Sequence, residues 1–294
     1  SELADEWEHQ VRIWRRINRR HKRRSGSAQI PLVNDEYFLY QTLIGVFPFT
    51  GADETFRLRI REYVVKAVRE AKEHTAWIKP DTDYEAACQS FVDGLLHGED
   101  NSFLSLFIPF QRKVAFYGLF NSLSQTLLKI AAPGIPDFYQ GTELWDFSLV
   151  DPDNRRPVDF DRRSRMLEDI RTRECDDPAG LVDELIRTRE DGRIKLFLIY
   201  RALQARRRAF DLFSHRSYIP LTAGGVYGHH VVAFARRYEK RWAVCVVPRR
   251  LSRVVAPDVL PLGDIWGDTH IVLPEEAPHS FEQVFTGHHL TVDN

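Results

Sequence analysis

The chain has 294 residues, of which 43% are hydrophobic and 28% are charged. This composition excludes disorder along the whole length, because 19 phenylalanines, 10 tyrosines and 6 tryptophans can bury ample apolar surface. Lysine and arginine (41) nearly balance aspartate and glutamate (42), so the net charge alone gives no argument for a nucleic acid or an anionic membrane as partner. No signal peptide opens the chain and no run of about 18 apolar residues occurs, so we expect a cytoplasmic protein that does not span a membrane.

The first residue and the cysteines support two further expectations. The chain begins at Ser1 and contains a single methionine, which predicts a processed chain or a piece of a longer one. Cys88, Cys175 and Cys245 lie far apart and form no CxxC pair or Cys/His cluster at zinc spacing. We therefore expect three reduced thiols, most of them buried, and no metal site.

The first two thirds of the sequence is predicted to be mostly helical. Apolar residues recur there at three- and four-residue spacing, the pattern of a helix that buries one face. Asn34 or Asp35 is expected to cap the second helix. The longest helix is apolar on nearly every side, which predicts a buried position. The expected helices cover residues 7–17, 34–46, 56–71, 80–95, 103–130, 163–171, 179–187 and 193–208.

Two parts of the sequence predict β-structure. Residues 133–141 are apolar and bounded by glycine, which indicates one strand, followed by a long polar loop over residues 142–161. A lone strand cannot satisfy its backbone groups, so its partners are expected elsewhere in the chain or on a missing preceding segment. After residue 213, β-branched and aromatic runs separated by Gly, Pro and Asp predict an all-β module of about 80 residues. These runs cover residues 226–236, 241–247, 271–273 and 280–285.

The densest basic run lies between Arg15 and Arg24. It could be a nucleic-acid arm, but no aromatic residues are interleaved with it, as single-strand binding would need. It also continues a helix whose other end is acidic, which suits the helix dipole. We favour a solvated helix end or an intramolecular salt-bridge surface, with no nucleic-acid partner.

The strongest chemical pattern is the loop over residues 151–159. Asp151, Asp153, Arg155 and Arg156 alternate carboxylate and guanidinium groups between two prolines. Sugar hydroxyl groups need both donors and acceptors, so this set suits a hydroxyl-rich ligand. A structural network of Asp–Arg pairs that fixes the loop explains the same pattern equally well.

Two other sets of residues are candidates for a carbohydrate site. Glu143 lies beside aromatic residues, and rings next to carboxylates are typical of sugar binding. Glu143 and Asp151 could be taken for the acid and nucleophile of a glycosidase, but their spacing alone is weak evidence. Asp35, Glu36 and Tyr37 form the third candidate, for which helix capping is the competing interpretation.

Longer motifs give the sequence a specific resemblance. Residues 133–143, Pro-Gly-Ile-Pro-Asp-Phe-Tyr-Gln-Gly-Thr-Glu, resemble the last barrel strand of the α-amylase superfamily. The continuation through residue 159, with Asp-Pro-Asp-Asn-Arg-Arg-Pro-Val-Asp at its end, resembles the maltooligosyltrehalose synthases of that superfamily (glycoside hydrolase family 13). Further motifs follow in the family's order along essentially the whole chain. They are Asn-Asp-Glu-Tyr at 34–37, Lys-Leu-Phe at 195–197, Phe-Ala-Arg at 234–236 and Trp-Gly-Asp-Thr at 266–269.

The resemblance implies an α+β fold and an activity. The expected fold is a mostly helical insertion with the last strand and helix of a (β/α)8 TIM barrel, followed by a C-terminal antiparallel β-sandwich. We assign residues 1–131 to the helical region, 132–213 to the barrel end and 214–294 to the sandwich. The implied enzyme is an isomerase of trehalose biosynthesis. It converts the reducing-end α-1,4 linkage of a maltooligosaccharide into an α,α-1,1 linkage by intramolecular transglycosylation, without a cofactor.

The family's three catalytic carboxylate motifs do not occur in this chain, which contains no His-Asp dipeptide. We therefore expect a C-terminal portion, inactive alone, whose partner is the missing N-terminal portion and whose substrate is a maltooligosaccharide. No residue is assigned as catalytic. The alternative is a non-catalytic carbohydrate-binding or scaffold module of the same ancestry. The residues expected to line or brace the sugar pocket are Gln140, Glu143, Asp151, Asp153, Arg155, Arg156, Asp35, Glu36 and Tyr37.

Overall fold

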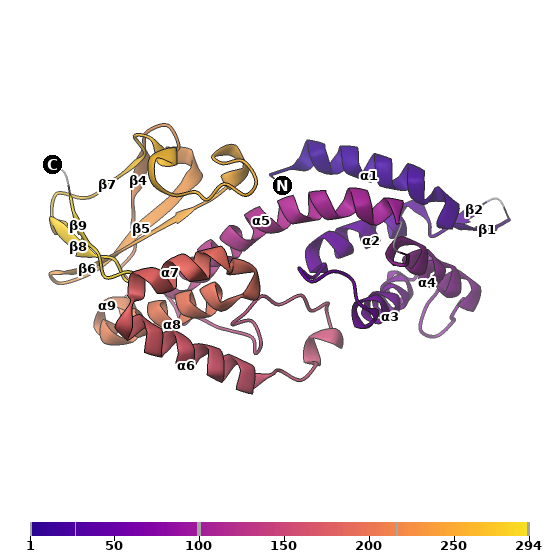
Figure 1. Cartoon of the computed structure of the whole chain (residues 1–294), viewed down its shortest axis with the longest axis horizontal. Helices are drawn as coiled ribbons and strands as arrows, with labels where there is room; N and C mark the ends of the chain where they lie inside the picture. Colours follow the sequence, from indigo (N-terminus) through magenta and orange to yellow (C-terminus); the bar gives the residue numbers. More distant parts are fainter. Residues whose placement is uncertain (1, 27, 99–100, 216, 293–294) are drawn as a thin grey trace. The chain divides into compact units, whose positions relative to one another are not determined.

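The computed structural model describes residues 2–26, 28–98, 101–215 and 217–292, which form two compact units. Unit 1 comprises Ser1–Ala115 and Phe147–Arg156, and unit 2 comprises Phe116–Asp146 and Pro157–Asn294. Helix α5 (Ser102–Ala131) runs from one unit into the other, and Figure 1 colours the chain from the N-terminus (indigo) to the C-terminus (yellow). This division differs from the three predicted regions, because a single 30-residue helix contributes its two halves to different cores.

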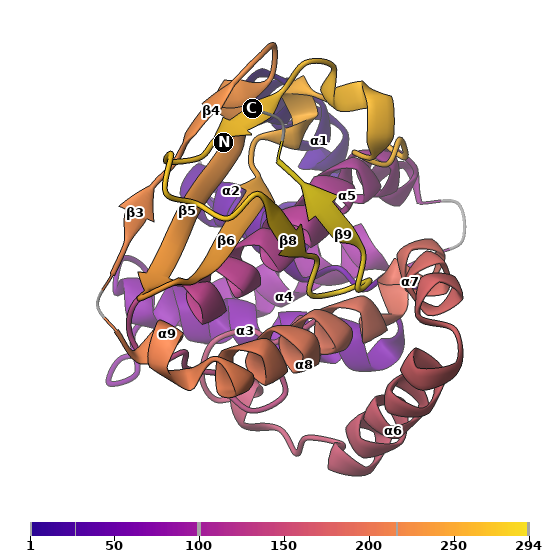
Figure 2. The same ribbon diagram turned by 90° about the vertical axis from the view of Figure 1, so that its left-hand side faces the viewer.

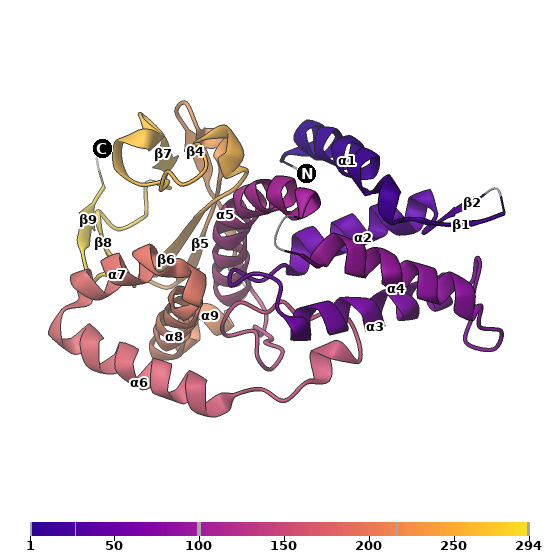
Figure 3. The same cartoon turned by 45° about the vertical axis from the view of Figure 1, so that its right-hand side comes forward.

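Unit 1 is a set of helices with one small hairpin. The helices expected from the periodicity are all present, and α3 and α4 lie side by side (Figure 3). The antiparallel hairpin β1–β2 was not predicted, because its strands have only three residues each. The bounds are α1 (Ala4–Asn18), η1 (Arg19–His21), β1 (Arg23–Ser25), β2 (Ala28–Ile30), α2 (Val33–Val46), α3 (Glu54–Ala71) and α4 (Thr82–Leu96).

The core of unit 1 is built around Trp14, which is fully buried. Its ring lies 5.5 Å from that of Tyr40, 5.7 Å from Phe103 and 5.4 Å from Phe107, measured between centroids. Tilted and edge-to-face contacts of this kind add to the free energy gained from burying the rings. The apolar stripe of α1 is therefore buried, as the sequence pattern predicted, and it packs against α2 and the first half of α5.

The starts of the helices show two side-chain caps and correct one prediction. Asp53 and Asp81 cap α3 and α4, because their carboxylates accept hydrogen bonds from the backbone N–H groups of Phe56 and Tyr84. The prediction that Asn34 or Asp35 caps α2 is wrong. The cap position is Leu32, and both residues lie inside the first turn. The helix already begins at Val33. The negative charge of Asp35 in its first turn interacts favourably with the helix dipole, but its carboxylate does not cap a backbone N–H group.

The helices of unit 2 pack around a separate apolar cluster. Ile170, Leu181, Leu185 and Phe197 bury the inner faces of α6, α7 and α8, which lie together in Figure 3. Among the described residues, no helix is both long and apolar enough to cross a membrane, and this includes α5. The bounds are α6 (Phe160–Asp176), α7 (Pro178–Arg187), α8 (Arg193–Arg208) and α9 (Phe210–Ser214), with 3₁₀ turns η3 (Arg189–Asp191), η4 (Gly228–His230), η5 (Leu251–Arg253) and η6 (Gly263–Trp266).

The described residues of the β-module of unit 2 form three small antiparallel sheets. The long strands β5 and β6 pair over their full length, as Figure 2 shows, and β3 adds to β5 to give the order β3-β5-β6. The other two sheets are the pairs β4–β7 and β8–β9. The predicted antiparallel character is confirmed, whereas the β-sandwich stays a prediction. The bounds are β3 (Ile219–Pro220), β4 (Thr222–Gly224), β5 (Val231–Tyr238), β6 (Arg241–Pro248), β7 (His270–Val272), β8 (Ser280–Glu282) and β9 (His289–Thr291).

The expected strand over residues 133–141 is absent from this structure. None of these residues is assigned to a strand, and the side chain of Ile135 is 95% exposed. Two prolines remove backbone donors there, and no described segment pairs with this stretch. An unpaired segment cannot form a ladder of hydrogen bonds, so no strand forms here within the described residues. Its place as the last strand of a barrel stays a prediction.

Two arginines hold the C-terminal end of α5, where helix carbonyl groups lack partners within the helix. Arg206 donates to the carbonyls of Ile130 and Ala132, the first at 2.5 Å. Arg236 is 1% exposed and donates to the carbonyl of Ala131 at 2.9 Å. Positive charge at this end also suits the helix dipole. The Phe-Ala-Arg motif at 234–236 thus supplies a structural contact between β5 and α5.

Candidate functional site

The loop over residues 147–156 belongs to unit 1, where α3 anchors it. The guanidinium of Arg59 donates to both carboxylate oxygens of Asp153, at 2.8 and 2.7 Å, and to the carbonyl of Phe147 at 2.8 Å. Both charged side chains are about 15% exposed or less. A bidentate pair of this kind fixes direction as well as distance. Arg59 therefore sets the position of the loop that carries four of the nine sequence-predicted site residues.

The carboxylate of Asp153 is also bound inside the loop. Its Oδ2 accepts a hydrogen bond from the backbone N–H of Leu149 at 2.7 Å. Burial alone raises the pKa of a carboxyl group, but the hydrogen bonds from Arg59 and Leu149 outweigh it and hold the pKa of Asp153 below its ordinary value. Asp153 is thus ionised at neutral pH and fully engaged in structure.

The other charged residues of the loop pair with one another. Asp151 forms an ion pair with Arg155, four residues along, and Arg156 forms one with Asp153 at 3.1 Å. The Arg155 and Asp151 side chains are both more than half exposed. The structural interpretation of the alternating pattern is therefore confirmed as far as the pairing goes. A role of these residues in sugar binding stays a prediction.

The remaining loop candidates, Gln140 and Glu143, lie in unit 2. Gln140 is exposed. Glu143 accepts a hydrogen bond from Arg163 Nε at 2.9 Å, and the same guanidinium donates to the carbonyls of Gly141 at 2.8 Å and Asp159 at 3.0 Å. Glu143 thus orients an arginine that braces the turn after residue 139, and it does not share a unit with Asp151.

A cleft of about 390 Å³ opens in unit 1 between α2 and α3, with Val150 of the loop at its edge. Its volume lies in the usual range for small-molecule sites. Tyr37 and Phe38 contribute half-exposed rings, and Phe38 stacks on Tyr63 with the centroids 6.0 Å apart. The full lining is Asn34, Asp35, Tyr37, Phe38, Gln41, Tyr63, Val64, Ala67, Val68, Glu70, Ala71 and Val150.

Hydrogen bonds fix two polar groups of this cleft, those of Asp35 and Tyr37. The Trp7 indole N–H donates to the Tyr37 hydroxyl at 2.9 Å, and the Tyr84 hydroxyl donates to the Asp35 carboxylate. Burial, with the hydrogen bond and charge of Asp35, raises the pKa of Tyr84, so Tyr84 remains the donor at neutral pH. Asp35 and Tyr37 are therefore held in place beside aromatic rings.

Glu36 does not lie in this cleft, although it stands between Asp35 and Tyr37 in the sequence. Its side chain is on another face of α2, 1% exposed, where it accepts a hydrogen bond from the Tyr40 hydroxyl at 2.9 Å and pairs with Lys22 at 2.7 Å. Successive residues of a helix are about 100° apart, so adjacent side chains reach different surroundings. The structure thus brings Asp35 and Tyr37 to one cleft, whose lining includes Val150 of the loop but none of the predicted loop residues, and it separates Glu36 from both.

Sequence reasoning missed Arg59, Phe38 and Tyr63. Arg59 is one of three arginines at alternate positions in α3, and its partner is 94 residues away, so no local pattern distinguishes it. Phe38 directly follows the Asn-Asp-Glu-Tyr motif at 34–37. Two adjacent aromatic residues, Tyr37 and Phe38, are therefore the sequence signal that could have indicated it. In the described part of the chain, no three or more His, Cys, Asp or Glu side chains come together in a way that could hold a metal ion.

Several solved structures similar to this chain carry the name maltooligosyltrehalose synthase. The maltooligosyltrehalose synthase of Arthrobacter ramosus matches 99% of this chain with a TM-score of 0.75 and 29% identity, and the chain covers 33% of it. A protein of Sulfolobus tokodaii described as a hypothetical maltooligosyl trehalose synthase matches 99% of the chain with a TM-score of 0.69 and 27% identity. No protein-family model matches the chain.

The curated proteins give the same result. Proteins from two strains of Mycobacterium tuberculosis, named as maltooligosyl trehalose synthases, are 34% identical over 237 residues, or 79% of this chain. The chain spans 28% of the length of these relatives. It is therefore homologous to part of the maltooligosyl trehalose synthases, which confirms the resemblance found in the sequence motifs.

Proposed function

We propose that this chain forms the substrate-holding, non-catalytic part of a maltooligosyl trehalose synthase. The whole enzyme would convert the reducing-end α-1,4 linkage of a maltooligosaccharide into an α,α-1,1 linkage. The observation that carries the proposal is the match to such synthases along 99% of the chain at 29% identity. Because the chain covers only a third of the matched enzyme, the catalytic carboxylates would be supplied by the remainder.

The state of the candidate carboxylates supports a non-catalytic role. Asp153 is paired with Arg59, Glu143 with Arg163, and Asp35 accepts the Tyr84 hydroxyl. Retaining glycosidase chemistry needs one carboxylate free to attack the anomeric carbon and a second that donates a proton. Side chains committed to structural hydrogen bonds are poorly suited to either task. Such side chains can instead hold a binding surface in a fixed conformation.

The α2–α3 cleft has the chemistry of a glucose subsite. The stacked Phe38 and Tyr63 rings present apolar faces on which the C–H face of a glucose ring can pack. Asn34, Asp35 and Gln41 place amide and carboxylate groups around those rings, and they can accept and donate hydrogen bonds to hydroxyl groups. Fixed polar groups around an apolar platform are the usual composition of a small-molecule site.

Replacing Phe38 with alanine is expected to weaken the binding of maltoheptaose to this chain by about two- to twelvefold, because aromatic contacts of this kind contribute ~0.5–1.5 kcal/mol. Isothermal titration calorimetry measures the change. Phe160→Ala is the matched control, since Phe160 is also an exposed phenylalanine but lies in unit 2, at the start of α6. Equal affinity of Phe38→Ala and the unchanged chain, or no saturable binding at all, would contradict the proposed subsite.

Incubation of the purified chain with maltopentaose is expected to leave the concentration of reducing ends unchanged. The physical reason is the commitment of its candidate carboxylates to ion pairs and hydrogen bonds. A reducing-sugar assay over a day provides the measurement, with boiled chain as the blank. A loss of reducing ends above the blank would show that this chain carries its own catalytic carboxylates. In that case the assignment of a purely substrate-holding role would be wrong.

A further inference from the structure

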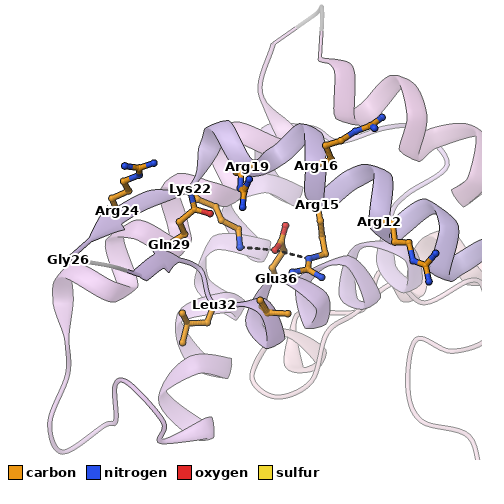
Figure 4. Close-up of a pocket in the computed structure, with 11 residues that line it drawn as sticks. Arg12, Arg15, Arg16, Arg19, Lys22, Arg24, Gly26, Gln29, Leu32 and Glu36 are labelled. Atoms are coloured by element: carbon orange, nitrogen blue, oxygen red, sulfur yellow. Dashed lines mark ion pairs between the residues drawn. The ribbon is translucent and has the colours of Figure 1, made fainter.

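A second cleft of unit 1 is lined mainly by cations and is not used by the proposed function. It has a volume of about 910 Å³ and lies between α1, the β1–β2 hairpin and the start of α2 (Figure 4). Six of its lining residues are cationic and one, Glu36, is anionic. The lining residues are Arg12, Arg15, Arg16, Arg19, Lys22, Arg24, Gly26, Gln29, Leu32, Val33 and Glu36.

The spacing of the arginines explains why they meet. Arg12, Arg15, Arg16 and Arg19 recur at three- and four-residue intervals, so they share one face of α1 and the turn that follows it. That face is opposite to the stripe that buries Trp14. The basic run of the sequence therefore forms one wall of a concave surface.

Glu36 fixes the centre of this cleft. Figure 4 shows Lys22 and Arg15 pointing toward its carboxylate, with ion-pair distances of 2.7 and 3.6 Å. Lys22 is further fixed by the carbonyl of Pro31, to which it donates at 2.8 Å. One buried carboxylate thus orients two cations, but it cannot balance the charge of the whole set. Arg15 retains a side chain that is 44% exposed.

Arg16 and Arg19 have N–H donors that no described residue engages. Arg19 points into the cleft above Glu36 in Figure 4. Within the described ranges, neither Arg16 nor Arg19 makes a side-chain hydrogen bond or ion pair. Arginine presents several N–H groups in a planar fork that fits phosphate oxygens, so an anion seated beside Arg15 and Arg19 would meet donors from both. Gln29 adds a neutral polar side chain to the wall.

We propose that this cleft binds a phosphate ester of a small molecule carrying at least two negative charges. The volume exceeds what a bare phosphate ion needs, and the apolar wall of Leu32 and Val33 offers contact for an uncharged portion. The lining contains no aromatic ring on which a base could stack, which argues against single-stranded nucleic acid. A bound ester at α1 and α2 would lie beside the elements that carry the sugar-binding cleft of unit 1.

The test is calorimetric titration of the 294-residue chain with pyrophosphate, glucose 6-phosphate and glucose in 50 mM NaCl. Both phosphorylated probes are expected to bind saturably and more weakly at higher salt, and glucose is not. Tighter binding of glucose 6-phosphate than of pyrophosphate would indicate that the apolar wall contributes. Absence of saturable binding by both phosphorylated probes would overturn the proposal.

Variants assign the binding to the cleft. Arg15→Gln with Arg19→Gln is expected to weaken pyrophosphate binding at least about tenfold, because hydrogen bonds between charged groups are lost. The control is Arg207→Gln with Arg208→Gln, which removes the same charge from the exposed end of α8. If the first pair impairs folding, Arg19→Gln alone tests the site, since its side chain makes no contact that folding requires. Equal losses in both pairs would show a general charge effect and reject the site.

A DNA duplex serves as the competing macromolecule. Retention of the duplex that pyrophosphate does not displace would mean that this surface is a nucleic-acid interface and would contradict the small-molecule site. Displacement of a weakly bound duplex by pyrophosphate would support the cleft as the shared phosphate site. Because these readouts do not involve maltooligosaccharides, their failure is distinguishable from failure of the proposed function.

Discussion

Replacing Arg236 with methionine is expected to lower the free energy of unfolding of the chain by at least about 3 kcal/mol, because a buried donor set is removed and its acceptors are left unpaired. Arg236 is 1% exposed and donates to the carbonyls of Ser217, Ala131 and Phe213 at 2.5, 2.9 and 3.0 Å, and also to that of His215. These carbonyls belong to the end of α5, to α9 and to the residues that follow it. Loss of the side chain therefore loosens three segments at once.

The measurement is urea denaturation followed by circular dichroism. Arg237→Met is the matched control, because Arg237 is the next residue of β5, is exposed and packs over the ring of Trp242. Its replacement is expected to change the free energy of unfolding by less than about 1 kcal/mol. Arg236→Lys is expected to recover little of the lost free energy of unfolding. A single ammonium group cannot reach all the carbonyls that are arranged around the planar guanidinium. Similar losses for Arg236→Met and Arg237→Met would contradict the assigned role.

Replacing Arg59 with methionine is expected to lower the free energy of unfolding by about 2–3 kcal/mol and to release the loop over residues 147–156. The change removes a bidentate partner from Asp153, whose carboxylate then stays nearly buried and keeps Arg156 and Leu149 as its partners among the described residues. Hydrogen exchange detected by mass spectrometry locates the effect, because the amide of Leu149 is held by Asp153. Arg57→Met is the control, since Arg57 pairs with the exposed Glu54 in the same helix.

The pH dependence gives this prediction a second readout. The pKa of Asp153 is lowered by folding, so its contribution to stability is present above the unfolded pKa of about 3.8 and is lost as the pH falls through the lower folded value. The difference in free energy of unfolding between the unchanged chain and Arg59→Met is therefore expected to be largest near neutral pH and to shrink in acid. A difference that does not vary between pH 7 and pH 3 would contradict the assigned ion pair.

The sequence by itself determined the helices, the β5–β6 hairpin and the relationship to the synthases. Helix stripes and strand alternation are local properties of the chain, because residues three or four apart share a helix face and residues two apart share a strand face. The stripe through Val11 and Trp14 thus predicted the buried side of α1 correctly. The motifs over residues 133–159 indicated the family for the same reason, since contiguous patterns can be recognised without knowledge of packing.

Only the tertiary structure decided which of the candidate residues lie together. Arg59 and Asp153 are far apart in sequence, and their pairing depends on where α3 and the loop pack. Glu36 lies one residue from Asp35 but on another face of α2, so a single turn of helix divides a predicted site between two clefts. Residues 133–141 show that a local apolar pattern is not sufficient for a strand. Such a segment becomes a strand only where another strand supplies hydrogen bonds. Contacts between distant residues follow from packing, which no local pattern encodes.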